Sequence, residues 1–242
     1  MMIRIKILII GMFLILKVAK SQNPPDSSRH FWLNVHLTKK DTGRLILMYP
    51  SIESGFTRDT LIFSDGKALY KGSANEPVLS HLIDPDKGDN RISFFIEPGE
   101  LKIYGSEDSL QSLTMIGSSS QDEWIRYLKS NADLRTEAER LSLNLRKIKD
   151  SAKTQMDSVL LLKFKEQIAL VSNRIDSINL AFARRSIFYV QEHTNSYISS
   201  TLLYGLLVNK QIETKTARNY FEKFANNVRG SKTGKLISKE FE

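Results

Sequence analysis

The sequence of 242 residues contains no cysteine. This absence excludes disulfide bonds, thiolate catalysis and zinc sites built on cysteine ligands. It also excludes a lipid anchor on an N-terminal cysteine. The folded protein must therefore be stabilised by its core, and the length suffices for one large domain or two small ones.

Long apolar runs are also scarce, and the most apolar one lies at the N-terminus. Arg4 and Lys6 precede an apolar stretch at 7–16, which has the length expected of a signal peptide and is short for a transmembrane span. Ala19 and Ser21 place small residues at the −3 and −1 positions of a cleavage site. The pattern predicts a signal peptide over 1–21, with export to the periplasm or cell envelope after cleavage near Ser21. The alternative is an uncleaved membrane anchor.

An excess of charge of one sign is nearly absent from the rest of the chain. Of the formal net charge of +8, residues 1–21 contribute four basic residues and no acid, which leaves 31 basic against 27 acidic residues. A net charge of +4 over about 220 residues is weak evidence for nucleic-acid binding, and we expect none. The polar, proline-containing segment 22–29 predicts a short flexible lead-in.

Residues 30–118 show the period-two alternation of β-strands. Apolar residues alternate over 31–37 and 45–49, on either side of the turn sequence KKDTG, which predicts a hairpin. A second hairpin is predicted around Ser64-Asp65-Gly66, and a third across Pro98-Gly99. We expect an antiparallel β-sandwich-like domain over 30–118.

Proline is absent after Pro98, and residues 119–242 have helical periodicity. Two apolar stripes are spaced by three and four residues: Leu134, Ala138, Leu141, Leu145 and Ile148, then Leu160, Phe164, Ile168, Val171, Ile175, Ile178 and Phe182. The break at 149–155 predicts a long antiparallel helical hairpin. Ser120 with Glu123 resembles a capping box, a third helix is expected over 194–207 behind Asn195 or Ser196, and a fourth over 213–228. The fold class is therefore α+β.

No recognisable catalytic constellation is present, and the chain lacks nucleotide-binding glycine loops. Glu97 precedes Pro98-Gly99 and is interpreted as the first residue of a hairpin turn instead of a general acid. The acidic segment 84–90 fails the EF-hand spacing and is interpreted as a solvated turn. Ser118 to Ser120 are expected to cap a helix.

The four histidines, His30, His36, His81 and His193, lack the spacing of metal ligands. We therefore predict no catalytic, cofactor-binding or metal-binding residue, no cofactor and no enzymatic activity. The mixed charges between Arg135 and Asp150 are typical of a solvated helix face. The open sides of the helical hairpin could instead dock a protein partner or a second copy of the chain.

Several short motifs occur in a consistent order. Asp65-Gly66-Lys67 is followed by Gly72, Glu97-Pro98-Gly99 and Gly117-Ser118. Together they resemble bacterial domain of unknown function 4369, a β-rich module found before thioredoxin-like domains in exported thiol:disulfide oxidoreductases. The segment around His193, Ser196, Ser199 and Leu202, and the sequence RGSKTGKLI at 229–237, are similar to the same proteins.

The resemblance implies an exported module associated with thiol chemistry, but its activity needs a C-x-x-C pair, and this sequence has no cysteine. We therefore expect a non-catalytic interaction or oligomerisation module of the cell envelope. The alternative is the N-terminal part, or split partner, of a thioredoxin-like oxidoreductase.

Overall fold

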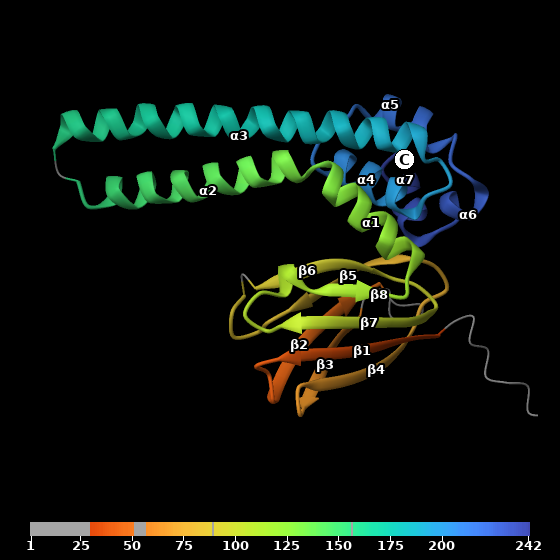
Figure 1. Ribbon diagram of the computed structural model, residues 1–242. Helices are drawn as coiled ribbons and strands as arrows, with labels where there is room; N and C mark the ends of the chain where they lie inside the picture. The colour runs from red at the N-terminus through yellow and green to blue at the C-terminus, as the bar shows by residue number, and fades with distance from the viewer. Residues whose placement is uncertain (1–29, 51–56, 89, 156) are drawn as a thin grey trace, which may run out of the picture.

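The structure is a computed structural model that describes residues 30–50, 57–88, 90–155 and 157–242. The predicted signal peptide and lead-in lie outside the described residues. An N-terminal curled sheet is followed by a helical region from which a long hairpin projects (Figure 1). The predicted α+β class, with a β-rich N-terminal part and a long helical hairpin, is confirmed.

The sheet has eight strands in the order β6-β5-β2-β3-β4-β1-β7-β8. Their bounds are β1 His30–Thr38, β2 Thr42–Tyr49, β3 Thr57–Ser64, β4 Lys67–Ser73, β5 Val78–Ile83, β6 Arg91–Ile96, β7 Gly99–Ser106 and β8 Thr114–Ile116. The pairing of β1 with β7 is parallel and the other pairings are antiparallel, so the sheet is mixed. A short 3₁₀ turn, η2 (Leu110–Ser112), precedes β8.

The curled sheet encloses the first hydrophobic core. Along β1, the apolar residues of the alternating pattern (Phe31, Leu33, Val35 and Leu37) are buried, while the residues between them are less buried. They join Leu45, Leu47, Phe94 and Ile103 from other strands in one cluster. The alternation therefore predicted correctly which side of β1 faces the interior.

Two of the three predicted hairpins are wrong. The strands β1 and β2 are not paired, because β1 lies between β4 and β7, and β2 lies between β3 and β5. The strands β6 and β7 are likewise unpaired, although only Glu97 and Pro98 separate them. The hairpin around Asp65 is confirmed, because Ser64 pairs with Lys67. Each wrong prediction joined strands that are adjacent in sequence but lie in different parts of the curled sheet.

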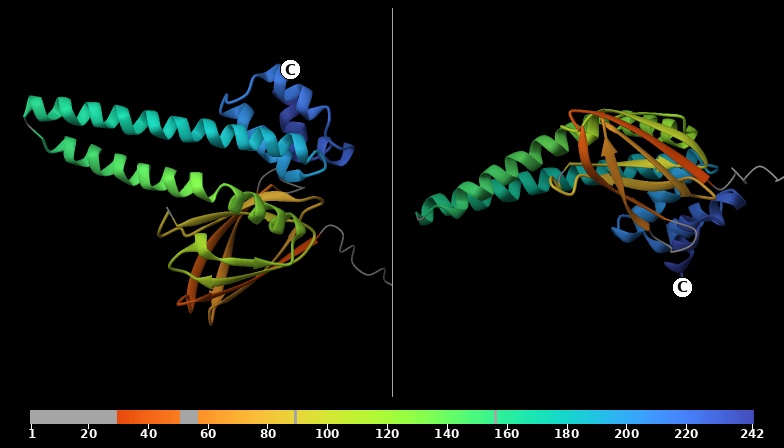
Figure 2. Two further views of the ribbon diagram at one scale, coloured as in Figure 1. Left: turned by 45° about the horizontal axis from the view of Figure 1, so that its top comes forward. Right: turned by 90° about the horizontal axis from the view of Figure 1, so that it is seen from below.

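The helices are α1 Ser119–Ser130, α2 Ala132–Lys153, α3 Ser158–Glu192, α4 Tyr197–Val208, α5 Thr214–Phe221, α6 Asn226–Arg229 and α7 Lys232–Lys239. The helices α2 and α3 run side by side as an antiparallel hairpin that extends beyond the sheet in every view (Figures 1 and 2). With 35 residues, α3 is about 50 Å long. The bend was predicted at 149–155, but α2 stays helical to Lys153, so only the last two residues of the predicted segment lie beyond the helix.

The C-terminal helices form a second core around Leu203, Phe221 and Val228. The predicted start of the third helix is confirmed, since Ser196 caps α4 by accepting a hydrogen bond from the Ile198 amide. The single fourth helix predicted over 213–228 is wrong, because α5 ends at Phe221 and α6 begins at Asn226. Phe224 lies between these two helices and is nevertheless buried. The apolar spacing therefore predicted its burial correctly, although this part of the chain is not helical.

Within the described residues, none of the helices combines the length and the apolar character needed to cross a bilayer.

Candidate functional site

Glu97 binds the N-terminus of α1, and its role as the corner of a hairpin is a prediction that the structure overturns. Its Oε1 accepts hydrogen bonds from the Ser119 amide (2.6 Å), the Ser119 hydroxyl (3.2 Å) and the Ser120 amide (3.4 Å). Its Oε2 accepts one from the Ser120 hydroxyl at 2.6 Å. A carboxylate at this position satisfies amides that lack partners within the helix and opposes the positive end of the helix dipole.

The cap of α1 lies two residues before the predicted one. Ser118, not Ser120, is the N-cap, and its hydroxyl oxygen accepts a hydrogen bond from the Gln121 amide at 3.0 Å. The Ser120 hydroxyl instead donates a hydrogen bond to Glu97, and Ser120 lies inside α1. The expectation that this serine run caps a helix is confirmed for Ser118.

Helix α1 also covers the free edge of the sheet at β6. The Phe95 amide donates to Gln121 Oε1 at 2.8 Å, and the Trp124 indole donates to the Ser93 carbonyl at 3.3 Å. An uncovered edge strand would present these backbone groups to other chains. Side chains of α1 therefore satisfy two backbone groups of this edge and fix the helix against it.

A continuous set of aromatic rings leads from the sheet to the helical hairpin. Phe95 contacts Trp124 with a centroid distance of 5.7 Å, and Trp124 stacks on Tyr127 at 5.4 Å. Tyr127 contacts Tyr189 of α3 at 5.0 Å, and Tyr189 contacts His193 at 4.2 Å. Such pairs add favourable contact energy beyond that of area burial. The base of the hairpin is therefore packed onto the sheet through α1.

Polar contacts reinforce this base. The Tyr127 and Ser186 hydroxyls lie 2.7 Å apart, and the Tyr189 hydroxyl donates to Glu123 at 2.5 Å. Arg185 binds Asp133 through two hydrogen bonds of 2.7 and 2.8 Å, and the guanidinium holds the pKa of this exposed carboxyl at about 2.

A second carboxylate holds another helix end against the sheet domain. Glu76 Oε1 accepts a hydrogen bond of 2.6 Å from the Lys232 amide at the start of α7. The Lys232 ammonium is buried without a hydrogen-bond partner in the described part of the chain, and desolvation lowers its pKa. These residues line a pocket of about 240 Å³. Glu76 and Glu97 thus use the same chemistry to attach the helical region at two points.

The hairpin leaves large apolar side chains in solvent along its length. Along α2 only Leu141 is buried, and along α3 only Ile178, Ala183, Ser186 and Val190 are. The exposed apolar residues of the two helices are Leu143, Val159, Leu160, Leu162, Leu170, Leu180 and Phe188. A pair of helices can cover only one side of each member, so the outer sides remain open.

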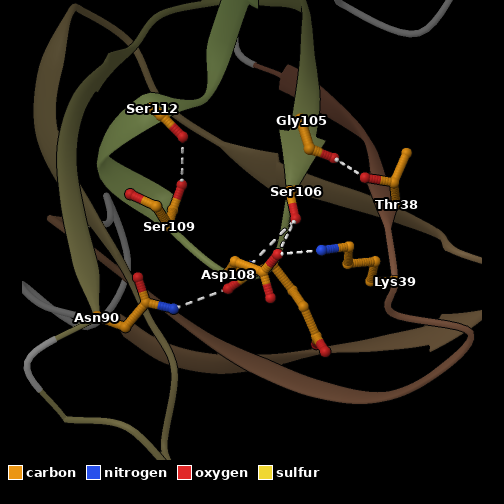
Figure 3. Close-up of polar contacts among 9 residues, drawn as sticks. Thr38, Lys39, Asn90, Gly105, Ser106, Asp108, Ser109 and Ser112 are labelled. Atoms are coloured by element: carbon orange, nitrogen blue, oxygen red, sulfur yellow. Dashed lines mark hydrogen bonds and ion pairs between the residues drawn. The ribbon is translucent and has the colours of Figure 1, made fainter.

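The acidic segment 84–90 organises the neighbouring loop. The Asn90 amide group donates to the Glu107 carbonyl at 2.9 Å, and its oxygen accepts from the Leu110 amide at 2.8 Å. In the same loop, Asp108 accepts hydrogen bonds from Lys39 and from the Ser106 hydroxyl (Figure 3). Asp84 also accepts a hydrogen bond from the Asp86 amide at 3.0 Å, so Asp84 and Asn90 hold the loop, while Asp86 and Lys87 are exposed. Residue 89 lies outside the described residues.

The histidines lie apart. His30 and His36 are on β1, His81 is on β5, and His193 follows α3. Across residues 30–50, 57–88, 90–155 and 157–242, no three metal-ligating side chains lie together.

His81 is expected to make stability depend on pH. Burial, and the charge of Arg91, lower the pKa of this imidazole. Below pH about 6.5 the unfolded chain takes up a proton that the folded protein resists, so the free energy of unfolding should fall as the pH is lowered through this region. The slope from one group cannot exceed about 1.4 kcal/mol per pH unit. Urea denaturation between pH 5 and 8 measures it.

The variant His81→Gln should flatten this dependence, because glutamine can keep a polar contact with Ser93, whose hydroxyl lies 2.9 Å from His81 Nδ1. Identical slopes in the variant and the parent would show that other groups cause the pH dependence.

The geometry defines an α+β protein in which a curled sheet carries a projecting helical hairpin through α1, a helix whose N-terminus is bound by Glu97. Residues 31–124 match a family described as a domain of unknown function (DUF4369). The matched region includes Glu97 and the start of α1, and the hairpin lies beyond it. No curated protein and no solved structure matches the chain.

Proposed function

We propose that this protein is an exported, non-catalytic interaction or oligomerisation module of the bacterial cell envelope. The hairpin is its binding element, and the sheet domain is the base that holds it. The module acts without a cofactor and does not bind nucleic acid.

The observation that supports this proposal is the exposure of the hairpin. Large apolar side chains lie in solvent along both helices, on a segment that extends away from the rest of the molecule (Figure 2). Exposed large apolar side chains that recur along one segment are typical of interaction sites. The aromatic and carboxylate contacts at its base give the hairpin a defined direction.

Site-specific photo-crosslinking in the native cells tests this function. A crosslinking residue at Leu162 or Leu170 should give discrete adducts in the envelope fraction. The same residue at Leu69, which is exposed on the sheet, is the matched control and should give none. A hairpin that forms no adduct at either position would contradict the proposal.

A second candidate is the N-terminal part, or split partner, of a thioredoxin-like thiol:disulfide oxidoreductase. It is favoured by the motifs at 65–67 and 97–99, and the second of these joins the sheet to α1. The intact mass of the native protein separates the candidates. A mass equal to residues 22–242 supports an exported, free-standing module. A mass larger by about 100–150 residues supports the second candidate in the form of one longer chain that continues into a thioredoxin-like domain.

A further inference from the structure

Helix α3 has a second apolar stripe on the side that faces solvent. Its apolar members, Leu162, Leu170, Leu180 and Phe188, are 59%, 70%, 53% and 65% exposed. At 3.6 residues per turn, these four residues fall within an arc of about 80°. The half-buried stripe on the side of α2, which includes Phe164, Ile168, Ile175 and Phe182, lies about 175° away around the helix. The two stripes are therefore on nearly opposite faces.

The solvent-facing stripe contains four further residues in the same arc. In chain order its members are Leu162, Glu166, Leu170, Asn173, Ser177, Leu180, Arg184 and Phe188. Their chemical classes are apolar, charged, apolar, polar, then polar, apolar, charged, apolar. The order is the same from either end, and each residue has a counterpart at an equal distance from position 175. We call these eight residues the symmetric seam.

This symmetry has a physical meaning for two antiparallel helices. A two-fold axis through position 175 places Leu162 of one copy against Phe188 of the other, and Leu170 against Leu180. It also places Glu166 against Arg184 of the second copy, with opposite charges, at both ends of the contact. Two-fold interfaces require this self-complementarity, in which residue i meets j while j meets i.

The two charged members of the seam are available for such a pairing. Neither Glu166 nor Arg184 forms an ion pair with another described residue of its own chain. By contrast Arg185, one position along, is bound to Asp133. A hollow of about 430 Å³ beside the seam, lined in part by Arg184 and Phe188, leaves room for side chains of a second copy.

We propose that the symmetric seam is a homodimer interface, in which the α3 helices of two copies pack antiparallel about position 175. This inference rests on the proposed function and names its partner, a second copy of the chain. The contact would run about 40 Å along α3, from Leu162 to Phe188. Each α2 would lie on the outer side, so that four helices form one layer.

The first test is the mass of the full chain in solution, by light scattering coupled to size exclusion. The expected value is twice the chain mass. Leu170→Glu should weaken dimerisation at least tenfold, because it places a charge against Leu180 of the second copy. Leu143→Glu is the matched control, since Leu143 is a leucine on α2 of similar exposure, 61%. Circular dichroism verifies that both variants stay helical.

The second test addresses register and direction. Glu166→Arg and Arg184→Glu should each weaken the dimer, because like charges then meet, and the double variant should restore it. The absence of native cysteine permits a further measurement. A mixture of Glu166→Cys and Arg184→Cys chains should form interchain disulfides. Each variant alone should not, because its two copies of the cysteine lie about 27 Å apart along the helix.

The outcomes separate this inference from the proposed function. A monomeric wild-type chain, a dimer that survives Leu170→Glu, or failure of the double charge variant to recover would overturn the antiparallel seam. If such a monomer still forms adducts through Leu162 with another envelope component, the interaction function stands with a different partner. A monomer that forms no adducts would contradict both the antiparallel seam and the interaction function.

Discussion

Replacing Glu97 by alanine is expected to lower the free energy of unfolding by about 3 kcal/mol. Four donors at the start of α1 lose their acceptor. Ser119 is exposed, so water can replace its bonds, but Ser120 is buried and its amide and hydroxyl would be left unsatisfied. Hydrogen bonds to charged groups contribute about 1.5–3 kcal/mol each, and loss of the helix-dipole interaction adds about 0.3–1 kcal/mol. Urea denaturation followed by tryptophan fluorescence measures the loss.

The controls separate acceptor geometry from charge. Glu97→Gln keeps one acceptor oxygen and should cost about half as much. Ser120→Ala removes one donor, and in a double-mutant cycle with Glu97→Ala it should show coupling above about 0.5 kcal/mol. Glu139→Ala, at an exposed site with no ion pair to a described residue, should change stability by less than about 0.5 kcal/mol. A loss equally small for Glu97→Ala would show that the carboxylate does not hold α1.

The role of Glu97 was beyond sequence reasoning because its partners are tertiary. Ser119 and Ser120 are 22 and 23 positions away, and a residue before Pro98-Gly99 has a sufficient local explanation as a turn. The only signal was indirect. Glu97 is an acceptor at the end of a strand. A run of serines that starts a helix follows it after two further strands and supplies donors that could reach it.

The sheet shows the same limit at the level of strands. Alternation along β1 fixed its buried side, because that pattern depends on each residue's own environment. The alternation contained no information about the neighbours of β1, which are β4 and β7. Strand β7 lies about seventy residues further along the chain. In a curled sheet, strands adjacent in sequence can lie far apart, so turn chemistry at 39–43 did not imply pairing.

The helical hairpin could be predicted because the information for it is local. The spacing of apolar residues at three and four positions gave the inner stripes, and the loss of spacing gave the bend. The symmetric seam is also present in the sequence. Glu166 and Arg184 stand out only once the structure shows that their face of α3 is open.

Gly117 is the second position where a small change should have a large effect. It joins β8 to the cap of α1 with φ of +112°, in a region that residues with a side chain rarely adopt. A Cβ there would lie 2.3 Å from the Glu100 carbonyl oxygen of β7, which is backbone and cannot move aside. Strain from the dihedral alone costs about 1–3 kcal/mol. With the steric overlap added, Gly117→Ala should lower the free energy of unfolding by about 3 kcal/mol or more.

The matched control is the same substitution at Gly205, inside α4, where an added Cβ meets no atom within 4 Å. Gly205→Ala should raise stability by up to about 1 kcal/mol, because alanine is the better helix former. Gly117 and Glu97 both fix the start of α1, so a chain carrying both substitutions should lose less than the sum of the two losses. Additive losses would mean that the backbone approach at Gly117 stabilises the sheet independently of the carboxylate that holds the helix.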